Sequence, residues 1–348
     1  MSKYITVRSK SHSMLLDKKA LIISIVLFLF MAGIMSVSIG IGELYISPLE
    51  VLKSLTGTGS GMNDVVIQQF RLPRILIAVM AGASLSLAGA ILQGVIRNPL
   101  ASPDMLGIST GAGFAAVTFI TMFSNQSNNL KVSIGYLPVA AVLGAFGMAA
   151  LIYILAWKRG IAPVRLILIG VGLMTATQAL TTLMIILGPI YAASQATIWL
   201  TGTVYAANWQ DVNSLLPWFL ILVPVLLFFS RTLNIQELGD EVATSLGHSV
   251  HKGRFVLLLI STALAGSAVA FTGAIGFVGL IGPHIARRLV GSSFGAMLPV
   301  SGFLGAILVL LADLAGRTLF SPLEVPAGVF TAAIGAPYFI YLLFKNHG

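Results

Sequence analysis

The chain has 348 residues, of which 57% are hydrophobic and only 9% are charged, and its mean hydropathy is +0.96. A soluble domain carries roughly 25% charged residues, so this composition excludes a soluble protein. The formal net charge of +9 does not indicate a nucleic-acid partner, because the basic residues stand at the ends of apolar runs, and the absence of cysteine excludes disulfides and thiolate metal sites.

Apolar runs recur along the whole chain, and about 20 helical residues cross a bilayer core. The first run is too long for the apolar part of a signal peptide. We therefore expect a tail at 1–19 and one transmembrane domain at 20–348. The expected spans are 20–42, 75–96, 107–123, 136–157, 164–187, 213–230, 255–274, 275–290, 296–312 and 327–344. The sequence thus predicts an all-α polytopic membrane protein with about ten transmembrane helices.

Positive charge predicts the orientation, because cytoplasmic loops are enriched in Lys and Arg. The basic residues of the tail are Lys3, Arg8, Lys10, Lys18 and Lys19. With the tail in the cytoplasm, alternation of the spans places Arg97, the loops 158–165 and 231–254, Arg287 with Arg288, and Lys345 on the same side. Both termini are therefore expected in the cytoplasm.

The first motif is Arg71-Leu72-Pro73-Arg74, on the expected outer side. Pro73 can begin a helix, since its missing N–H falls among first-turn donors that have no intrahelical partner. Two outer arginines run against the usual charge bias. They either extend into lipid headgroups or form a docking site for the carboxylates of an external partner.

Two further motifs lie at breaks between spans. Asn98 and Pro99 end a helix in the stretch 93–110, which predicts a tight cytoplasmic turn and, taken alone, only a connector. In the stretch 276–284, Gly276, Gly279 and Pro283 favour short or broken helices that pack closely. His284 has no second ligand at metal-binding spacing. Packing or backbone capping is therefore favoured for it, and no metal is expected.

The segment 234–254 is the longest and most charged inner loop. It is compatible with a short amphipathic helix that ends at a glycine C-cap. Its candidate residues are Glu237, Asp240, Glu241, Ala243, Leu246 and Gly247. The pattern fits either a solvated surface helix or a surface gripped by a cytoplasmic motor.

Asp313 and Arg317 follow the run 296–312. An acid at a helix centre costs about 2.5–3.5 kcal/mol on insertion scales, and we expect Asp313 to avoid most of this cost at the outer end of its span. Its i,i+4 spacing permits an exposed ion pair with Arg317, which is also explained by simple interfacial stabilisation. Arg317 would then share the outer face with Arg71 and Arg74.

The absence of two kinds of motif limits the possible energy sources for transport. The chain has no GxxxxGK[ST] phosphate-binding loop, and no span carries a series of carboxylates and histidines for a proton relay. Energy must come from another chain, unless the protein is a passive channel or secondary carrier. A membrane-embedded enzyme is a third alternative, for which Ser102, Thr110 and His284 are the only hints, on separate segments.

The order of the motifs resembles that of the FecCD-type permeases, which import iron–siderophores, haem or vitamin B12 in ATP-binding-cassette (ABC) transporters. The matching stretches are RLPR at 71–74, LAGAILQGVIRNPLASPDMLGISTGA at 87–112, LGDEVATSLG at 238–247, GFVGLIGPHIARRLVG at 276–291 and ADLAGR…PLEVPAGVFTAAIGAPYF at 312–339. The resemblance implies a type II ABC importer permease fold with a cytoplasmic coupling helix pair.

The same resemblance implies the partners. A second permease, identical or related, would pair with this chain, and a cytoplasmic ABC ATPase dimer would receive the coupling segment 234–254. An external substrate-binding protein would dock on Arg71, Arg74 and Arg317. The chain itself would be no enzyme and hold no cofactor, and it would lie in a bacterial cell membrane.

Iron–siderophore is the expected cargo because it is the family's broadest substrate class, with haem or vitamin B12 as the alternative. The stretches 58–70, 124–135 and 188–212 match no motif of the family, and substrate or partner choice could reside there.

Overall fold

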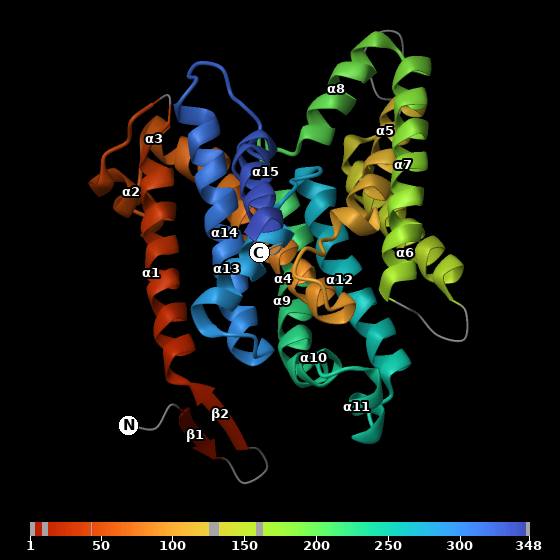
Figure 1. The fold of residues 1–348 in the computed structure, drawn as a ribbon. Helices are drawn as coiled ribbons and strands as arrows, with labels where there is room; N and C mark the ends of the chain where they lie inside the picture. The colour runs from red at the N-terminus through yellow and green to blue at the C-terminus, as the bar shows by residue number, and fades with distance from the viewer. Residues whose placement is uncertain (1–3, 9–12, 43, 125–131, 158–162, 346–348) are drawn as a thin grey trace.

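The computed structural model describes residues 4–8, 13–42, 44–124, 132–157 and 163–345, and nearly all of them are helical (Figure 1). Some residues used in the sequence analysis lie outside the described part. They are Lys3, Lys10, Lys131 and the loop 158–162.

A helix lies at each of the ten expected spans. These helices are α1 (Lys18–Gly40), α4 (Leu72–Ile96), α5 (Ile108–Phe123), α6 (Leu137–Ala156), α7 (Pro163–Leu187), α9 (Trp209–Phe228), α12 (Val250–Thr272), α13 (Val278–Val290), α14 (Phe294–Thr318) and α15 (Ala327–Lys345). In the described part, seven helices are long and apolar enough to cross a membrane. The 13 residues of α13 reach only about 20 Å. The helical membrane fold is therefore confirmed, and α13 is a half-length helix, as its glycines and proline predicted.

Several shorter helices lie between the spans. They are α2 (Pro48–Leu55), α3 (Gly61–Val65), the π-helical turn η1 (Val66–Arg71), the 3-10 turns η2 (Asp104–Leu106) and η3 (Ile134–Tyr136), α8 (Ile190–Thr201), α10 (Ser230–Glu237) and α11 (Asp240–Ser245). The stretches 58–70 and 188–212, which match no family motif, are thus largely helical.

Helix α4 begins at Leu72 and carries Pro73 in its first turn, as the sequence predicted. The helical backbone nevertheless starts earlier, because α3 and η1 precede α4 without a break from Gly61. A proline in a helix cannot donate the usual backbone hydrogen bond. The π-helical turn Val66–Arg71 stands directly before Pro73, so the regular bonding pattern is already interrupted where the proline arrives.

The N-terminal tail contains the only strands in the described part of the chain. Strands β1 (Tyr4–Arg8) and β2 (Ser13–Asp17) pair antiparallel, with Tyr4 opposite Asp17. Asp17 then caps α1, because its side chain accepts a hydrogen bond of 2.9 Å from the Lys19 backbone N–H. This hairpin, at the lower end of Figure 1, was not expected from the sequence.

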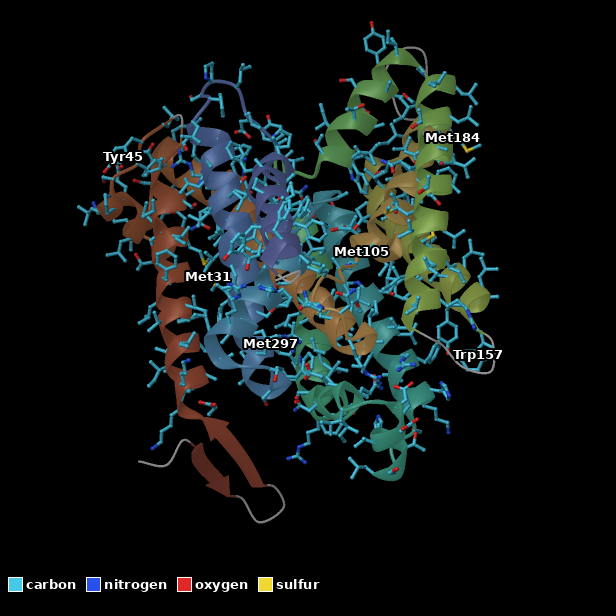
Figure 2. All side chains as sticks on the ribbon, in the orientation of Figure 1. Met31, Tyr45, Met105, Trp157, Met184 and Met297 are labelled. Carbon is cyan, nitrogen blue, oxygen red and sulfur yellow. The ribbon has the colours of Figure 1, made fainter. Side chains whose placement is uncertain are left out.

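Helix α4 is the centre of the molecule, packed against α12, α13 and α14 (Figure 1). Glycines bring these backbones together: a Cβ on Gly89 would stand 1.8 Å from the carbonyl oxygen of Gly279, and one on Gly82 would stand 2.4 Å from that of Gly305. Small residues allow such close packing in membranes. Helices α5 to α8 form a group on the right of Figure 1, and Met184 marks its upper end in Figure 2.

Candidate functional site

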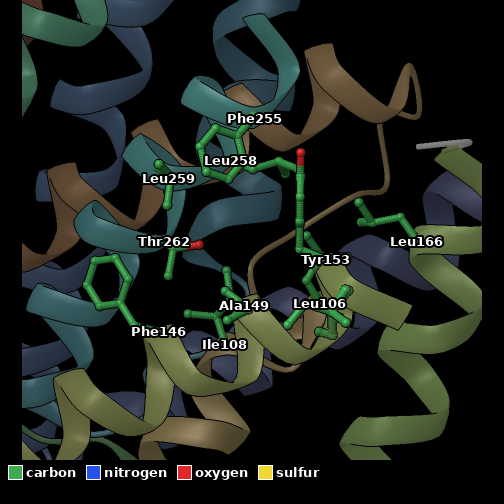
Figure 3. Close-up of a pocket in the computed structure, with 13 residues that line it drawn as sticks. Leu106, Ile108, Phe146, Ala149, Tyr153, Leu166, Phe255, Leu258, Leu259 and Thr262 are labelled. Atoms are coloured by element: carbon green, nitrogen blue, oxygen red, sulfur yellow. The ribbon is translucent and has the colours of Figure 1, made fainter. Parts of the chain in front are cut away.

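An apolar pocket of about 310 Å³ lies between α6 and α12 (Figure 3). Its walls include Phe146 and Tyr153 of α6 and Phe255 and Leu258 of α12, while Thr262 and the Tyr153 hydroxyl supply its only side-chain polar atoms. Such a surface suits hydrocarbon but offers no groups for chemistry or for coupling to a motor. The charged clusters at the two ends of the molecule are better candidates.

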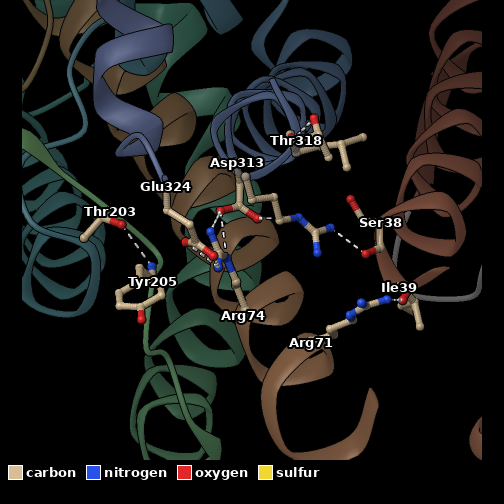
Figure 4. A network of polar contacts seen from close by, with 11 residues as sticks. Ser38, Ile39, Arg71, Arg74, Thr203, Tyr205, Asp313, Thr318 and Glu324 are labelled. Atoms are coloured by element: carbon tan, nitrogen blue, oxygen red, sulfur yellow. Dashed lines mark hydrogen bonds and ion pairs between the residues drawn. The ribbon is translucent and has the colours of Figure 1, made fainter. Parts of the chain in front are cut away.

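The first cluster, here called the outer network, consists of Arg71, Arg74, Asp313, Arg317 and Glu324 (Figure 4). Arg74 is its centre, with Nη2 2.7 Å from Asp313 Oδ1 and Nη1 2.9 Å from Glu324 Oε2. Arg317 Nε lies 3.8 Å from Asp313 Oδ2. These contacts join α4, α14 and the segment that leads into α15.

Two arginines of the outer network bind the end of α1. Arg71 donates to the carbonyls of Ile39 and Leu44, and Arg317 donates to that of Ser38, all at 2.5 Å. The last carbonyls of a helix lack intrahelical partners, and positive charge is favoured at that end. Arg71 and Arg317 therefore fasten the C-terminal end of α1 to the body.

The structure brings the three predicted docking arginines together, but it places them below the surface. Arg71 and Arg317 are each 7% exposed, and the side chain of Arg74 is 13% exposed. Arg71, Arg74, Arg317 and Glu324 all border an open cavity of about 530 Å³, and Glu324 is 35% exposed. In this conformation the guanidinium groups already donate hydrogen bonds to the chain's own carbonyls or pair with its own carboxylates. Docking of an external protein on them stays a prediction.

The expected position of Asp313 was wrong. Helix α14 continues to Thr318, so Asp313 lies inside the helix and is only 2% exposed. Its main partner is Arg74 of α4 rather than the i,i+4 neighbour Arg317. A buried acid persists where paired cations offset its desolvation.

The second cluster is the coupling segment 234–254, which holds the end of α10, all of α11 and the first turn of α12, at the lower end of Figure 1. The helix expected there is a pair of helices: Gly239, with a φ of +110°, separates them, and Gly247, with a φ of +77°, follows α11 as the predicted C-cap glycine. Within α11, Ala243 is buried and Glu241 is exposed. Leu246, which follows α11, is 64% exposed. The pair thus leaves an acidic and an apolar side chain exposed.

Asp240 connects the coupling segment to two other helices. Its Oδ1 lies 2.9 Å from Nη2 of Arg254 in α12 and also binds Nη2 of Arg97 at the end of α4. Burial raises the pKa of Asp240, but Arg254 and Arg97 together outweigh this effect and hold the pKa below its usual value. Asp240 is therefore a carboxylate at neutral pH.

Other contacts attach the coupling segment to the core. Glu237 Oε1 accepts a hydrogen bond of 2.6 Å from Arg287 of α13. The Gln236 carbonyl accepts one of 2.8 Å from Arg97 Nε, and the Asn234 side chain accepts one of 2.9 Å from the Phe294 backbone N–H. Arg97, Arg254 and Arg287 entered the sequence analysis only as charges near the ends of spans. Their position near the ends of apolar runs was the one signal of this role.

The turn motifs occupy the predicted breaks. Asn98 accepts a hydrogen bond of 2.9 Å from the Leu100 backbone N–H just after α4 ends, and Pro99 follows it. Gly276 precedes α13, Gly279 contacts α4, and Pro283 lies inside α13.

His284 packs against Tyr338 with ring centroids 5.7 Å apart, and neither ring nitrogen has a hydrogen-bond partner in the structure. Among the described residues no three His, Cys, Asp or Glu side chains form a group that could hold a metal ion.

This chain is similar to known transport proteins over nearly its whole length. The model of the FecCD transport family matches residues 25–345. A Bacillus subtilis protein named as a siderophore transport system permease, YfhA, is 52% identical over 330 residues, which are 95% of this chain and 96% of that protein. The iron(3+)-hydroxamate import permease FhuG of the same organism is 43% identical, over 94% of this chain and 98% of FhuG.

A solved structure shares the architecture. It is described as an inward-facing conformation of a metal-chelate type ABC transporter and superposes with a TM-score of 0.81 at 33% identity. The match covers 93% of this chain and 99% of the other. The fold built here from α4, its close-packed neighbours and the paired short helices is therefore a known transporter fold.

Proposed function

This chain belongs to the FecCD transport family, and from that premise we propose that it is the permease subunit of an ABC importer that brings iron–siderophore complexes into a bacterial cytoplasm. The observation that carries the proposal is similarity over more than nine-tenths of the chain to permeases named for siderophore, hydroxamate and ferric citrate transport. As a membrane subunit of this family the chain moves cargo, and we assign ATP hydrolysis to a separate ATPase.

The coupling segment supports an ATPase partner. Glu241 and Leu246 face outward, while Asp240, Glu237 and Gln236 hold the segment to α4, α12 and α13. When two ATPase subunits close on ATP, the segments in their grooves move with them. The ion pairs would transmit that movement to the central helices, because a charge pair between a short helix and a long one resists separation.

The outer network supports a binding-protein partner. Glu324 and Arg74 border the open outer cavity, where carboxylates of a docking protein could exchange with the chain's own acids. Arg71 and Arg317 would then connect docking to α1, whose end they hold. A second permease, identical or related, would complete the pathway.

The orientation follows the charges. The N-terminal hairpin and the coupling segment lie at the same end of the molecule (Figure 1), which is the end we assign to the cytoplasm. Lys345 of α15 is assigned to that side as well, so that both termini are cytoplasmic.

Uptake of radiolabelled iron tests the proposal. Cells with and without this gene receive iron as hydroxamate, catecholate or citrate chelates, with haem and vitamin B12 in parallel. Loss of uptake for one siderophore class, restored by the gene on a plasmid, is the expected result. Loss of haem or vitamin B12 uptake alone would show that the cargo is that compound and not an iron–siderophore complex. Unchanged uptake of every compound would overturn the proposal.

A further inference from the structure

The apolar pocket between α6 and α12 opens at a surface that suits lipid (Figure 3). Only 28% of the apolar span of α6 is buried by the rest of the chain. Ile154 of α6 and Leu259 of α12, which line the pocket, are exposed. A membrane-spanning helix turns such apolar side chains toward hydrocarbon. The pocket is therefore open to the acyl chains of the bilayer.

The pocket begins near one end of the two helices. Its lining on α12 runs from Phe255, in the second turn of that helix, to Thr262, which is about 10 Å further along the axis. Tyr153 lies in the last turn of α6, and Trp157 marks the lower end of that helix in Figure 2. One end of the pocket therefore lies at the edge of the membrane on the side of the coupling segment, and the other lies deeper in the bilayer.

Aromatic rings gather at this end, which is here called the mouth of the pocket. The ring centroid of Tyr153 lies 5.5 Å from that of Trp157 and 4.9 Å from that of Phe255. Trp157 in turn lies 6.3 Å from the ring of His251. Trp and Tyr are enriched where hydrocarbon meets the lipid headgroups. The cluster therefore places the mouth at headgroup level.

Basic side chains stand around the mouth. His251 and Lys252 are exposed, and they precede Phe255 by four and three residues, so both share the face of α12 that lines the pocket. Arg165 donates a hydrogen bond of 3.4 Å to the Ala156 carbonyl, which holds it at the end of α6. None of the described residues that line the pocket is charged. The site thus combines an apolar interior with a basic mouth.

The acids of the coupling segment leave this charge largely uncompensated. Asp240 is paired with Arg97 and with Arg254, which lies on the buried side of α12. Glu237 is paired with Arg287 of α13. An anion at the mouth would therefore meet cations that these carboxylates do not neutralise. Basic pockets between membrane helices on the cytoplasmic side bind anionic lipid headgroups by this combination of charge and depth.

We propose that the apolar pocket holds an acyl chain of an anionic phospholipid of the cytoplasmic leaflet, and that Lys252, Arg165 and His251 bind its phosphate. This inference goes beyond the proposed function and takes from it only the assignment of this end to the cytoplasm. The plain alternative is a crevice that any lipid chain fills. The two differ in outcome, because a crevice has no headgroup preference, whereas a phosphate site prefers an anionic lipid.

The test measures which lipid lies beside Trp157. The full chain is reconstituted in vesicles of phosphatidylglycerol and phosphatidylcholine with matched chains, and bromine is carried by one lipid or by the other. Bromine quenches the fluorescence of a nearby indole ring. The part due to Trp157 is the difference between each protein and its Trp157→Phe counterpart. In the wild type, binding beside Trp157 should favour phosphatidylglycerol at least about fivefold, the effect of one cation near the headgroup.

Three variants and one control locate the preference. Lys252→Gln and Arg165→Gln should each lower it about fivefold or abolish it, and Lys252 is exposed, so its replacement carries little risk to folding. Ala149→Phe fills the pocket and should lower the preference with every cation still present. Arg231→Gln is the control, because Arg231 is an exposed arginine in α10, away from the pocket lining. It should leave the preference unchanged.

Three results would overturn the inference. Equal quenching by the two brominated lipids in the wild type would show a crevice without headgroup preference. A preference that survives in Lys252→Gln, Arg165→Gln and Ala149→Phe alike would place the lipid elsewhere. An equal loss in Arg231→Gln would show that net charge attracts the lipid and that no site at the pocket does. The readout needs no transport, so it is independent of the cargo.

Discussion

The two ends of the molecule use the same side-chain types in opposite arrangements. In the outer network the acid is buried, since Asp313 is 2% exposed, and three arginines of low exposure surround it or bind backbone nearby. In the coupling segment the acid is accessible, since Asp240 is 46% exposed, and the buried member is Arg254 at 1%. The outer network therefore closes on itself, whereas the coupling segment keeps its carboxylates at the surface.

The difference shows what each cluster is suited to do. Breaking a buried pair leaves an uncompensated charge and is strongly destabilising, so the outer network holds α1, α4 and α14 together. A half-exposed pair contributes little to stability but joins two elements, which under the proposed function would move together. The following predictions test this contrast, from the largest expected effect to the smallest.

Asp313→Asn should destabilise the protein most. Removal of the buried charge leaves Arg74 and Arg317 without their shared partner, and loss of one member of a buried pair costs about 3–5 kcal/mol. Thermal unfolding of the purified protein in detergent measures this loss. Glu324→Gln is the matched control, because it removes the more exposed partner of Arg74 and should cost about 0–1 kcal/mol. Equal effects of the two variants would contradict the contrast.

Asp240→Asn should impair coupling more than folding. Loss of the charged hydrogen bonds to Arg97 and Arg254 should cost about 0–1 kcal/mol of stability. It should reduce transport per ATP hydrolysed about tenfold, because α11 is then no longer held to α4 and α12. The measurement uses proteoliposomes that contain the complete transporter. The ATPase should still co-purify with the variant.

A charge exchange separates coupling from structure at this site. Arg97→Asp combined with Asp240→Arg restores one ion pair between α4 and α11 and should recover part of the transport that either single change loses. Arg231→Gln, an exposed arginine of α10 with no ion pair among the described residues, is the control. A fall in unfolding temperature large enough to explain the transport loss would count against a coupling role.

Arg71→Glu and Arg74→Glu test docking at the outer network. Affinity for the external binding protein should fall about tenfold at low salt. The remaining binding should depend less on salt, because fewer charge pairs then cross the interface for salt to screen. Unfolding temperatures must be measured in parallel, since Arg71 also binds α1. If both variants fold and their affinity for the binding protein is unchanged, these arginines do not belong to the docking surface.

The smallest expected effect is that of pH on the Asp240 pairs. Because the folded protein holds the pKa of Asp240 below its usual value, the stability that these pairs contribute is present above the unfolded pKa, about 3.9. It is lost as pH falls through the lower folded pKa. The difference in unfolding temperature between the wild type and Asp240→Asn should therefore stay constant from about pH 5 to 8. A difference that declines within this range would place the pKa of Asp240 higher than we infer.

The sequence by itself determined the membrane fold, the ten helical segments, the coupling segment with its glycine cap, and the family, whose resemblance the comparisons confirm. These features depend on apolar run length, on glycine and proline, and on local motif order, all of which are readable along the chain. The helices of 61–71 and 190–201 and the N-terminal hairpin were missed because their patterns are short and mixed.

Only the tertiary structure decided which charges meet. Asp313 pairs with Arg74, 239 residues away, and Asp240 with Arg97, 143 residues away. Glycine contacts bring α4 against α13 and α14 and so set the distances at both ends. A cavity of about 670 Å³ likewise borders two helix breaks, 97–107 and 273–277, that packing places together. Local pattern fixes where helices form, but partners, burial and cavities follow from how those helices pack.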